Sequence, residues 1–360
     1  MIRMIVTAWT ALLLLGGCNN DYDGENGLQS AEQATTGVQA SLQSIRENVI
    51  VPESAAAASA SAAMTAAAEA LAEDPDAQTL AAAQAAFETL MAAWKKTEAV
   101  YVAGKLDSSM IDVPGEMDYF HVGNEDYRAQ LDAIFAGSGT LETQLFRNSH
   151  KSINALEYAL FGSDHNNTAL LTQMAAQSAR RAQAAVIMAE ALQAHLQSIA
   201  DFYAADGLFV GKGDDTVEEL LNQMITSAYE LKEWRVGDPA GLTVSYLDDP
   251  DASRLEYADA RLSLVAVRAI LETHEAVMTQ GLLSISIGAY AEVEGRQAAA
   301  DITDALAAVD AFDGALLEDD LGSEETEVLY QRLDALFDAY YVDLINALQL
   351  STDIIDADGD

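Results

Sequence analysis

The chain has 360 residues, of which 58 are acidic and 18 are basic, so its formal net charge at pH 7 is −40. This acidic excess argues against binding to nucleic acid or to an anionic membrane surface, because both require clusters of basic side chains. Half of the residues are hydrophobic, and the length suits one large or two medium-sized domains.

The first residues are typical of a bacterial lipoprotein signal. A positive charge at Arg3 precedes an apolar run from Ile5 to Leu15, which is too short to span a bilayer as a helix. Small residues then lead to Cys18, the only cysteine of the chain. We expect residues 1–17 to be a signal peptide that is removed, and Cys18 to carry lipid. The alternative is an ordinary signal peptide with an incidental cysteine.

The residues after Cys18 predict where the protein is anchored. Residues 18–27 are polar and acidic, which is typical of a tether between lipid and folded protein. Asn19 does not resemble the usual signal for retention in the inner membrane. We therefore expect a cell-envelope protein, anchored in the outer membrane and facing the periplasm.

Most of the remaining chain has the apolar spacing of amphipathic helices, and strand-like alternation is almost absent. The five prolines fall where the apolar pattern is interrupted, which predicts helix boundaries. The helices are expected at residues 28–50, 53–73, 77–103, 125–136, 140–161, 167–205, 215–235, 254–279, 288–310 and 323–350.

The segment 207–215 is the best candidate for a domain boundary, because three glycines and two aspartates interrupt the helical pattern there. It would link a first helical bundle, 28–206, to a second, 216–360. The predicted fold is therefore all-α, with two four-helix-bundle-like domains packed side by side after a lipoprotein signal peptide.

The segment 147–162, RNSHKSINALEYALFG, contains the main candidate site. Leu156 and Leu160 belong to an apolar stripe at helical spacing, whereas Asn154 and Glu157 lie three residues apart on another face. An amide and a carboxylate so placed are a candidate pair of ligands. The alternative is the polar edge of an ordinary helix.

This segment resembles the signature helix of the imelysin family, whose pattern is Gly-x-His-x-x-Glu. Glu157 matches the glutamate, but Ser152 stands in place of the glycine and Asn154 in place of the histidine. Other similarities to the family lie at residues 93–98, 111–114, 236–239, 256–264 and 355–360. The resemblance implies two helical bundles with a cleft between them, and a metal-binding or peptidase role for the histidine and glutamate.

Glu157, with Asn154 and Ser152, is thus the principal ligand or metal candidate. Imidazole with carboxylate suits iron or zinc, whereas an amide suits harder cations such as calcium, so the missing histidine weakens a transition-metal site. His150, one turn before Asn154, is a candidate substitute. Two further candidates, in an acidic segment that could fold over Glu157, are Asp112 and His121. No catalytic residue is assigned, and motifs of classical hydrolases are absent.

Three functions follow from these observations. The first is a binding or accessory lipoprotein in the uptake of iron or another metal ligand, acting with iron-uptake components and with a divalent metal (iron, zinc or calcium) as the implied cofactor. The second is a non-catalytic scaffold or solute-binding lipoprotein. The third is a metallopeptidase, which the replaced histidine disfavours.

Overall fold

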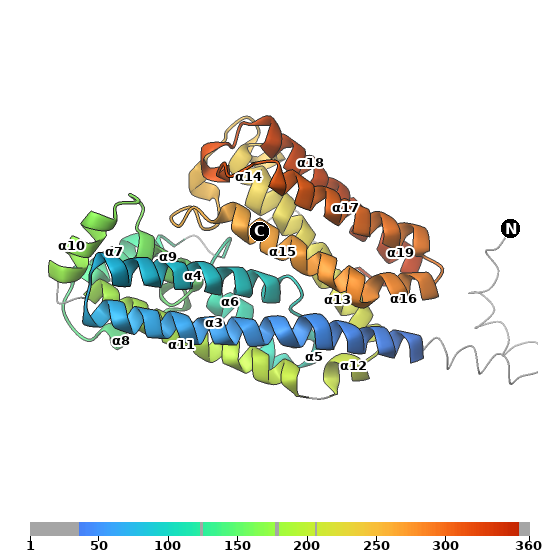
Figure 1. Cartoon of the computed structure of the whole chain (residues 1–360), viewed down its shortest axis with the longest axis horizontal. Helices are drawn as coiled ribbons and strands as arrows, with labels where there is room; N and C mark the ends of the chain where they lie inside the picture. Colours follow the sequence, from blue (N-terminus) through green and yellow to red (C-terminus); the bar gives the residue numbers. More distant parts are fainter. Residues whose placement is uncertain (1–35, 123–124, 177–179, 206, 353–360) are drawn as a thin grey trace, which may run out of the picture.

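The computed structural model describes residues 36–122, 125–176, 180–205 and 207–352 (Figure 1). Within these ranges every regular element is helical and there is no strand, which confirms the predicted all-α fold. A search of the same residues finds no helix with the length and apolar character needed to cross a bilayer. The predicted signal peptide, Cys18, the tether at 18–27 and the last eight residues lie outside the described residues.

The first part of the chain forms a group of long helices (Figure 1). Helical residues 36–45 continue through η1 (Arg46–Ile50) into α3 (Val51–Glu73), which packs along both α4 and α11. The remaining elements of this group are α4 (Ala77–Glu98), α5 (Ala103–Leu106), η2 (Ser108–Met110), α6 (Val113–Met117), α7 (Tyr127–Ala136), α8 (Leu141–Gln144), η3 (Asn148–His150), α9 (Ile153–Phe161), α10 (Asn167–Ala176) and α11 (Arg180–Ala204).

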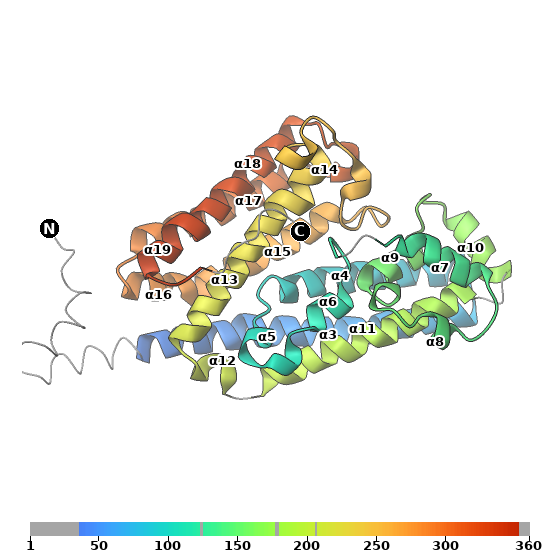
Figure 2. The same cartoon turned by 180° about the vertical axis from the view of Figure 1, so that it is seen from behind.

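The second part forms another group, which lies against the first (Figures 1 and 2). Its centre is the contact of α17 with α15, α16 and α18. The elements are α12 (Leu208–Gly211), α13 (Asp214–Glu230), η4 (Leu231–Gly237), α14 (Asp238–Ala240), η5 (Val244–Tyr246), η6 (Ala252–Arg254), α15 (Ser263–Val277), η7 (Met278–Leu282), α16 (Leu283–Gly288), α17 (Glu292–Asp310), η8 (Leu317–Asp319), α18 (Glu324–Asp338), η9 (Ala339–Leu344) and α19 (Ile345–Leu348).

Several predicted helix boundaries are wrong. The helix is not interrupted at Pro52. The π-helical turn η1 precedes this residue, and Pro52 lies in the first turn of α3, where a missing backbone N–H costs few hydrogen bonds. The predicted helix 140–161 is divided into α8, η3 and α9, because Ser152 caps a new helix. The predicted helix 254–279 starts at Ser263 and runs on to Gly288, since residues 255–262 form turns.

The two groups of helices share their buried side chains, which form one continuous hydrophobic cluster. At Gly281 in η7 a Cβ atom would lie 2.6 Å from the carbonyl oxygen of Ser41, so glycine permits η7 to approach the first helix closely. The predicted linker is partly helical, because it contains α12 and the start of α13. The division into two domains at 207–215 stays a prediction.

Candidate functional site

The signature helix α9 is short, buried and capped at both ends. The Ser152 hydroxyl accepts a hydrogen bond from the Ala155 N–H at 3.2 Å, and Gly162 ends the helix with a φ of 62°. The buried guanidinium of Arg181 donates to the Ala159 carbonyl at 2.9 Å and to the Tyr158 carbonyl. Helix α9 therefore holds its side chains in fixed positions relative to α11.

The polar face of α9 joins two distant segments. The Tyr119 N–H donates to Asn154 Oδ1 at 2.7 Å, and the Ala260 N–H donates to Glu157 Oε1 at 2.9 Å. Asn154 is 5% exposed and Glu157 is 2% exposed. These two side chains thus fix segment 118–122 and loop 255–262 on the same helix.

The environment of Glu157 favours its protonated form. Burial raises the pKa of Glu157 to about 8, with a further increase from the negative charge of Asp259. The hydrogen bond from the Ala260 N–H and the positive charge of Arg128 oppose this increase. At pH 7 the carboxyl is therefore mostly neutral and can donate as well as accept a hydrogen bond.

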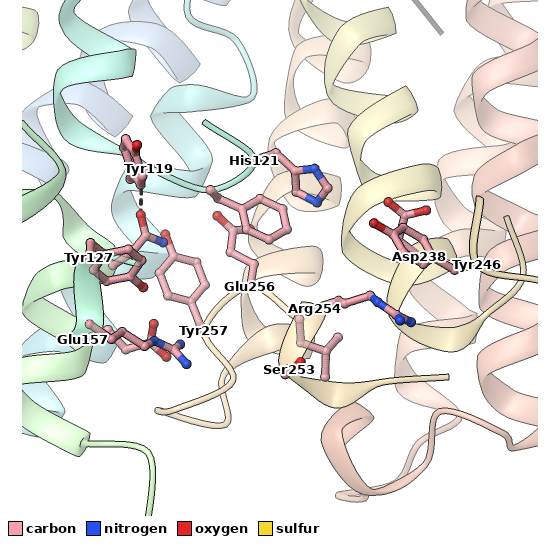
Figure 3. Close-up of a pocket in the computed structure, with 14 residues that line it drawn as sticks. Tyr119, His121, Tyr127, Glu157, Asp238, Tyr246, Ser253, Arg254, Glu256 and Tyr257 are labelled. Carbon is pink, nitrogen blue, oxygen red and sulfur yellow. Dashed lines mark hydrogen bonds between the residues drawn. The ribbon is translucent and has the colours of Figure 1, made fainter. Parts of the chain in front are cut away.

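A cavity of about 300 Å³ lies beside this face, between the two groups of helices (Figure 3). The first group of helices contributes aromatic, amide and charged side chains to the wall of the cavity. The second group contributes Asp238, Tyr246 and residues 253–257. The lining residues are Tyr119, Phe120, His121, Tyr127, Arg128, Asn154, Glu157, Asp238, Tyr246, Ser253, Arg254, Leu255, Glu256 and Tyr257.

Two of the lining residues have an unusual backbone conformation. Tyr257 and His121 have φ values of 58° and 56°. These values lie in the left-handed region of backbone conformation, which residues other than glycine rarely adopt. Tyr257 is 1% exposed, yet its hydroxyl has no hydrogen-bond partner among the described residues. In Figure 3 its ring lies between Glu157 and Glu256. Strained residues and an unsatisfied buried hydroxyl are both features that functional sites often contain.

A network of buried charges adjoins the cavity. The Lys95 ammonium is fully buried and lies 2.7 Å from Asp118 Oδ2, 2.8 Å from Glu98 Oε2 and 2.5 Å from Glu256 Oε1. Burial disfavours the charged ammonium, but these three carboxylates outweigh it and raise the pKa of Lys95. The carboxylates come from α4, from the segment after α6 and from loop 255–262. The network therefore connects the two groups of helices.

A second cation completes this network. The buried Arg235 guanidinium lies 2.7 Å from Glu256 Oε2, 2.9 Å from Glu230 Oε2 and 3.2 Å from Glu98 Oε2. Two cations thus share four carboxylates, one of which is Asp118. Burial raises the pKa of Glu98, and the positive charges of Lys95 and Arg235 oppose this increase.

The structure brings only some of the predicted site residues to the cavity. Glu157, Asn154 and His121 line it, and the His121 ring also stacks on Trp234 with a centroid distance of 4.8 Å. Ser152 is the cap of α9 and does not line the cavity.

The other two predicted residues have different surroundings. His150 Nε2 is 2.8 Å from Gln130 Oε1, and burial lowers the pKa of the imidazole. Asp112 is exposed at the start of α6. Neither residue lines the cavity.

Several lining and network residues were not predicted from the sequence. Glu256 and Tyr257 fall in a segment that was assigned to a helix, and Glu256 lies 161 positions after its partner Lys95 in the sequence. The available signal was the sequence from Arg254 to Arg261, in which charged and apolar residues do not follow the spacing of an amphipathic helix.

The side chains at this site do not fit the divalent metal that the signature implies. Among the described residues no group of three His, Cys, Asp or Glu side chains is placed to hold an ion. Asn154 Oδ1 and Glu157 Oε1 already accept backbone hydrogen bonds. We derive no chemical step that uses a metal.

The model of the imelysin family matches residues 50–340. The chain belongs to the imelysin family. Its fold is similar to that of an imelysin-like protein from Psychrobacter arcticum, with a TM-score of 0.65 and 19% identity over 89% of this chain and 98% of that one. It is also similar to a candidate iron-regulated protein A precursor from Parabacteroides distasonis, with a TM-score of 0.67 and 12% identity over 87% and 94% of the chains. No functionally curated protein matches the chain.

Proposed function

We propose that this imelysin-family protein is a periplasm-facing lipoprotein of the outer membrane that binds a small polar solute and thereby assists the uptake of iron or another metal in chelated form. The observation that carries the proposal is the cavity between Glu157 and Tyr257. Its volume, about 300 Å³, is at the lower end of the range of about 300–1,000 Å³ for small-molecule sites, which suits a small ligand.

The groups that line the cavity favour a solute with several oxygen atoms. The neutral Glu157 carboxyl and the guanidinium groups of Arg128 and Arg254 are hydrogen-bond donors at the cavity, and Tyr257 lines it with a hydroxyl that has no hydrogen-bond partner among the described residues. The charge of Glu256 is offset by its contacts with buried cations. A chelated metal presents oxygen atoms to such donors, whereas a bare ion needs ionised ligands.

Two other observations support the cellular role. One of the similar structures is that of a candidate iron-regulated protein, and the sequence around Cys18 is typical of a lipoprotein signal. The envelope location is tested by labelling cells with a tagged fatty acid. Wild-type protein should take up the label and a Cys18→Ser variant should not; an unlabelled wild-type protein would contradict lipid anchorage.

The binding role is tested with a strain that lacks the gene, grown under iron limitation and supplied with radioactive ferric citrate. The strain should take up less iron than wild type, and a Tyr257→Phe variant should restore uptake poorly. The substitution removes only a hydroxyl that has no partner in the described part of the chain, so we expect the fold to be retained. Tyr341→Phe, outside the cavity, is the matched control and should restore uptake fully. Wild-type uptake in the deletion strain would overturn the proposal.

A further inference from the structure

Exposed apolar side chains gather at one end of the molecule. Tyr290 is 87% exposed and Val293 is 77% exposed, and both lie in or next to the turn between α16 and α17. Ile287 in α16 and Leu208 in α12 are also exposed. Figures 1 and 2 show α12, α16 and α19 at this same end. We call Leu208, Ile287, Tyr290 and Val293 the apolar end patch.

The sequence that leads into the patch lacks charged side chains. Residues 276–291 contain no charged side chain, although about one residue in five of the whole chain is charged. The exposed part of this stretch, residues 287–290, carries two large apolar side chains close together, whereas most surfaces contain scattered ones. The patch is therefore a candidate contact surface.

A groove of about 700 Å³ lies at the same end. It brings together the beginning of the first described helix, the beginning of α13 and the ends of α16 and α19. Most of its lining is apolar or small; the residues are Gly37, Val38, Asp214, Val217, Ser284, Ile285, Ile287, Gly288, Ala289, Leu348, Gln349 and Leu350. The chain thus enters the fold beside the apolar end patch.

The position of this entry point limits what can reach the patch. Thr36 follows Cys18 by 18 positions, and a chain of this length spans at most about 60 Å when fully extended. A lipid on Cys18 would hold Thr36 within this distance of a bilayer, but it would not determine how the protein is oriented on the bilayer. An apolar surface near Thr36 that contacts the bilayer would determine this orientation.

We propose that the apolar end patch is a membrane-contacting surface, which lies on a zwitterionic bilayer when Cys18 carries lipid. The proposal rests on the lipid anchorage in the proposed function. Tyrosine is suited to the boundary between headgroups and acyl chains, and Val293 and Ile287 supply apolar surface beside it. The net charge of −40 and the glutamates at 292 and 294 would be repelled by anionic lipids, so the contact requires a surface without net charge.

The test uses the chain from Cys18 onward, coupled through its only thiol to maleimide-bearing phosphatidylcholine vesicles. This chemical coupling replaces biological lipidation, so it separates failure of the contact from failure of the lipoprotein prediction. A Tyr290→Trp variant reports contact through quenching by brominated acyl chains. The matched control is Val244→Trp, because Val244 is 99% exposed and lies beside α14, at the other end of the second group of helices (Figure 1).

We expect brominated lipid to cause a loss of fluorescence in Tyr290→Trp beyond that in Val244→Trp, and inclusion of anionic lipid to reduce this loss. Trp94 and Trp234 give the same background in both variants. Equal quenching at the two positions would overturn the proposal. So would a dimer of the uncoupled protein in sedimentation that a Tyr290→Ser substitution abolishes, because the patch would then be an interface between copies.

Discussion

The neutral carboxyl of Glu157 makes a specific prediction about stability and pH. Its pKa is about 8 in the folded protein, against an ordinary value of 4.5. Between these two values the folded protein keeps a proton that the unfolded chain releases, so the stability of the folded state falls as pH rises. The loss between pH 5 and pH 8 should be about 3 kcal/mol, from about 1.4 kcal/mol for each pKa unit.

The substitution Glu157→Gln isolates this effect, because glutamine resembles the protonated carboxyl and does not titrate. Its side-chain oxygen can still accept from the Ala260 N–H. We expect the variant to have nearly wild-type stability at pH 5. At pH 8 it should be more stable than wild type by about 3 kcal/mol, since only the wild type loses the contribution of the proton.

The measurement is urea unfolding at pH 5, 6, 7 and 8 of wild type, Glu157→Gln and Glu88→Gln. Glu88 is an exposed glutamate on α4, so its substitution should change stability little at any pH. Other groups that titrate in this range, such as Glu98, contribute to wild type and variants alike and cancel in the difference. A stability difference between Glu157→Gln and wild type that stays constant from pH 5 to pH 8 would refute the reasoning.

Three other substitutions test the core, the charge network and the replaced histidine. Leu160→Ala should lower the free energy of unfolding by about 2–5 kcal/mol, because the side chain is fully buried; a loss under 1 kcal/mol would contradict this packing. Lys95→Met should cost about 3–5 kcal/mol in urea unfolding, since buried carboxylates lose their shared cation; wild-type stability would show that they are neutral. Asn154→His should raise the affinity for zinc at least about tenfold, or about 1.4 kcal/mol, as measured by titration calorimetry. If Asn154→His/Glu157→Ala binds zinc as tightly as Asn154→His does, a site with two ligands on α9 is excluded.

The fold could be predicted well where apolar periodicity continues without interruption. The expected helix 323–350 corresponds to α18, η9 and α19 over residues 324–348, because Leu329, Leu333 and Leu336 mark its buried face. The prediction failed where a local signal was ambiguous. Pro52 suggested a boundary, but a π-helical turn accommodates it, and Ser152 begins a helix within a segment that has helical spacing throughout.

The candidate site could be predicted only where its residues are close in the sequence. Asn154 and Glu157 share a helix face, and both line the cavity. Their partners are the backbone N–H groups of Tyr119 and Ala260, at separations of 35 and 103 residues. Tyr257 lines the cavity with a left-handed backbone conformation, which no local pattern indicated. Such contacts are fixed by the tertiary fold.

The sharing of Lys95 among carboxylates from three segments has a consequence for how such a chain can diverge. A change at Lys95 leaves buried negative charge at Glu98, Asp118 and Glu256 at once, so it is tolerated only if several of these positions change with it. Related chains should therefore vary at the four positions as a set. A chimaera that joins the first 206 residues of one relative to the remainder of another should fold only when both parents carry the same set.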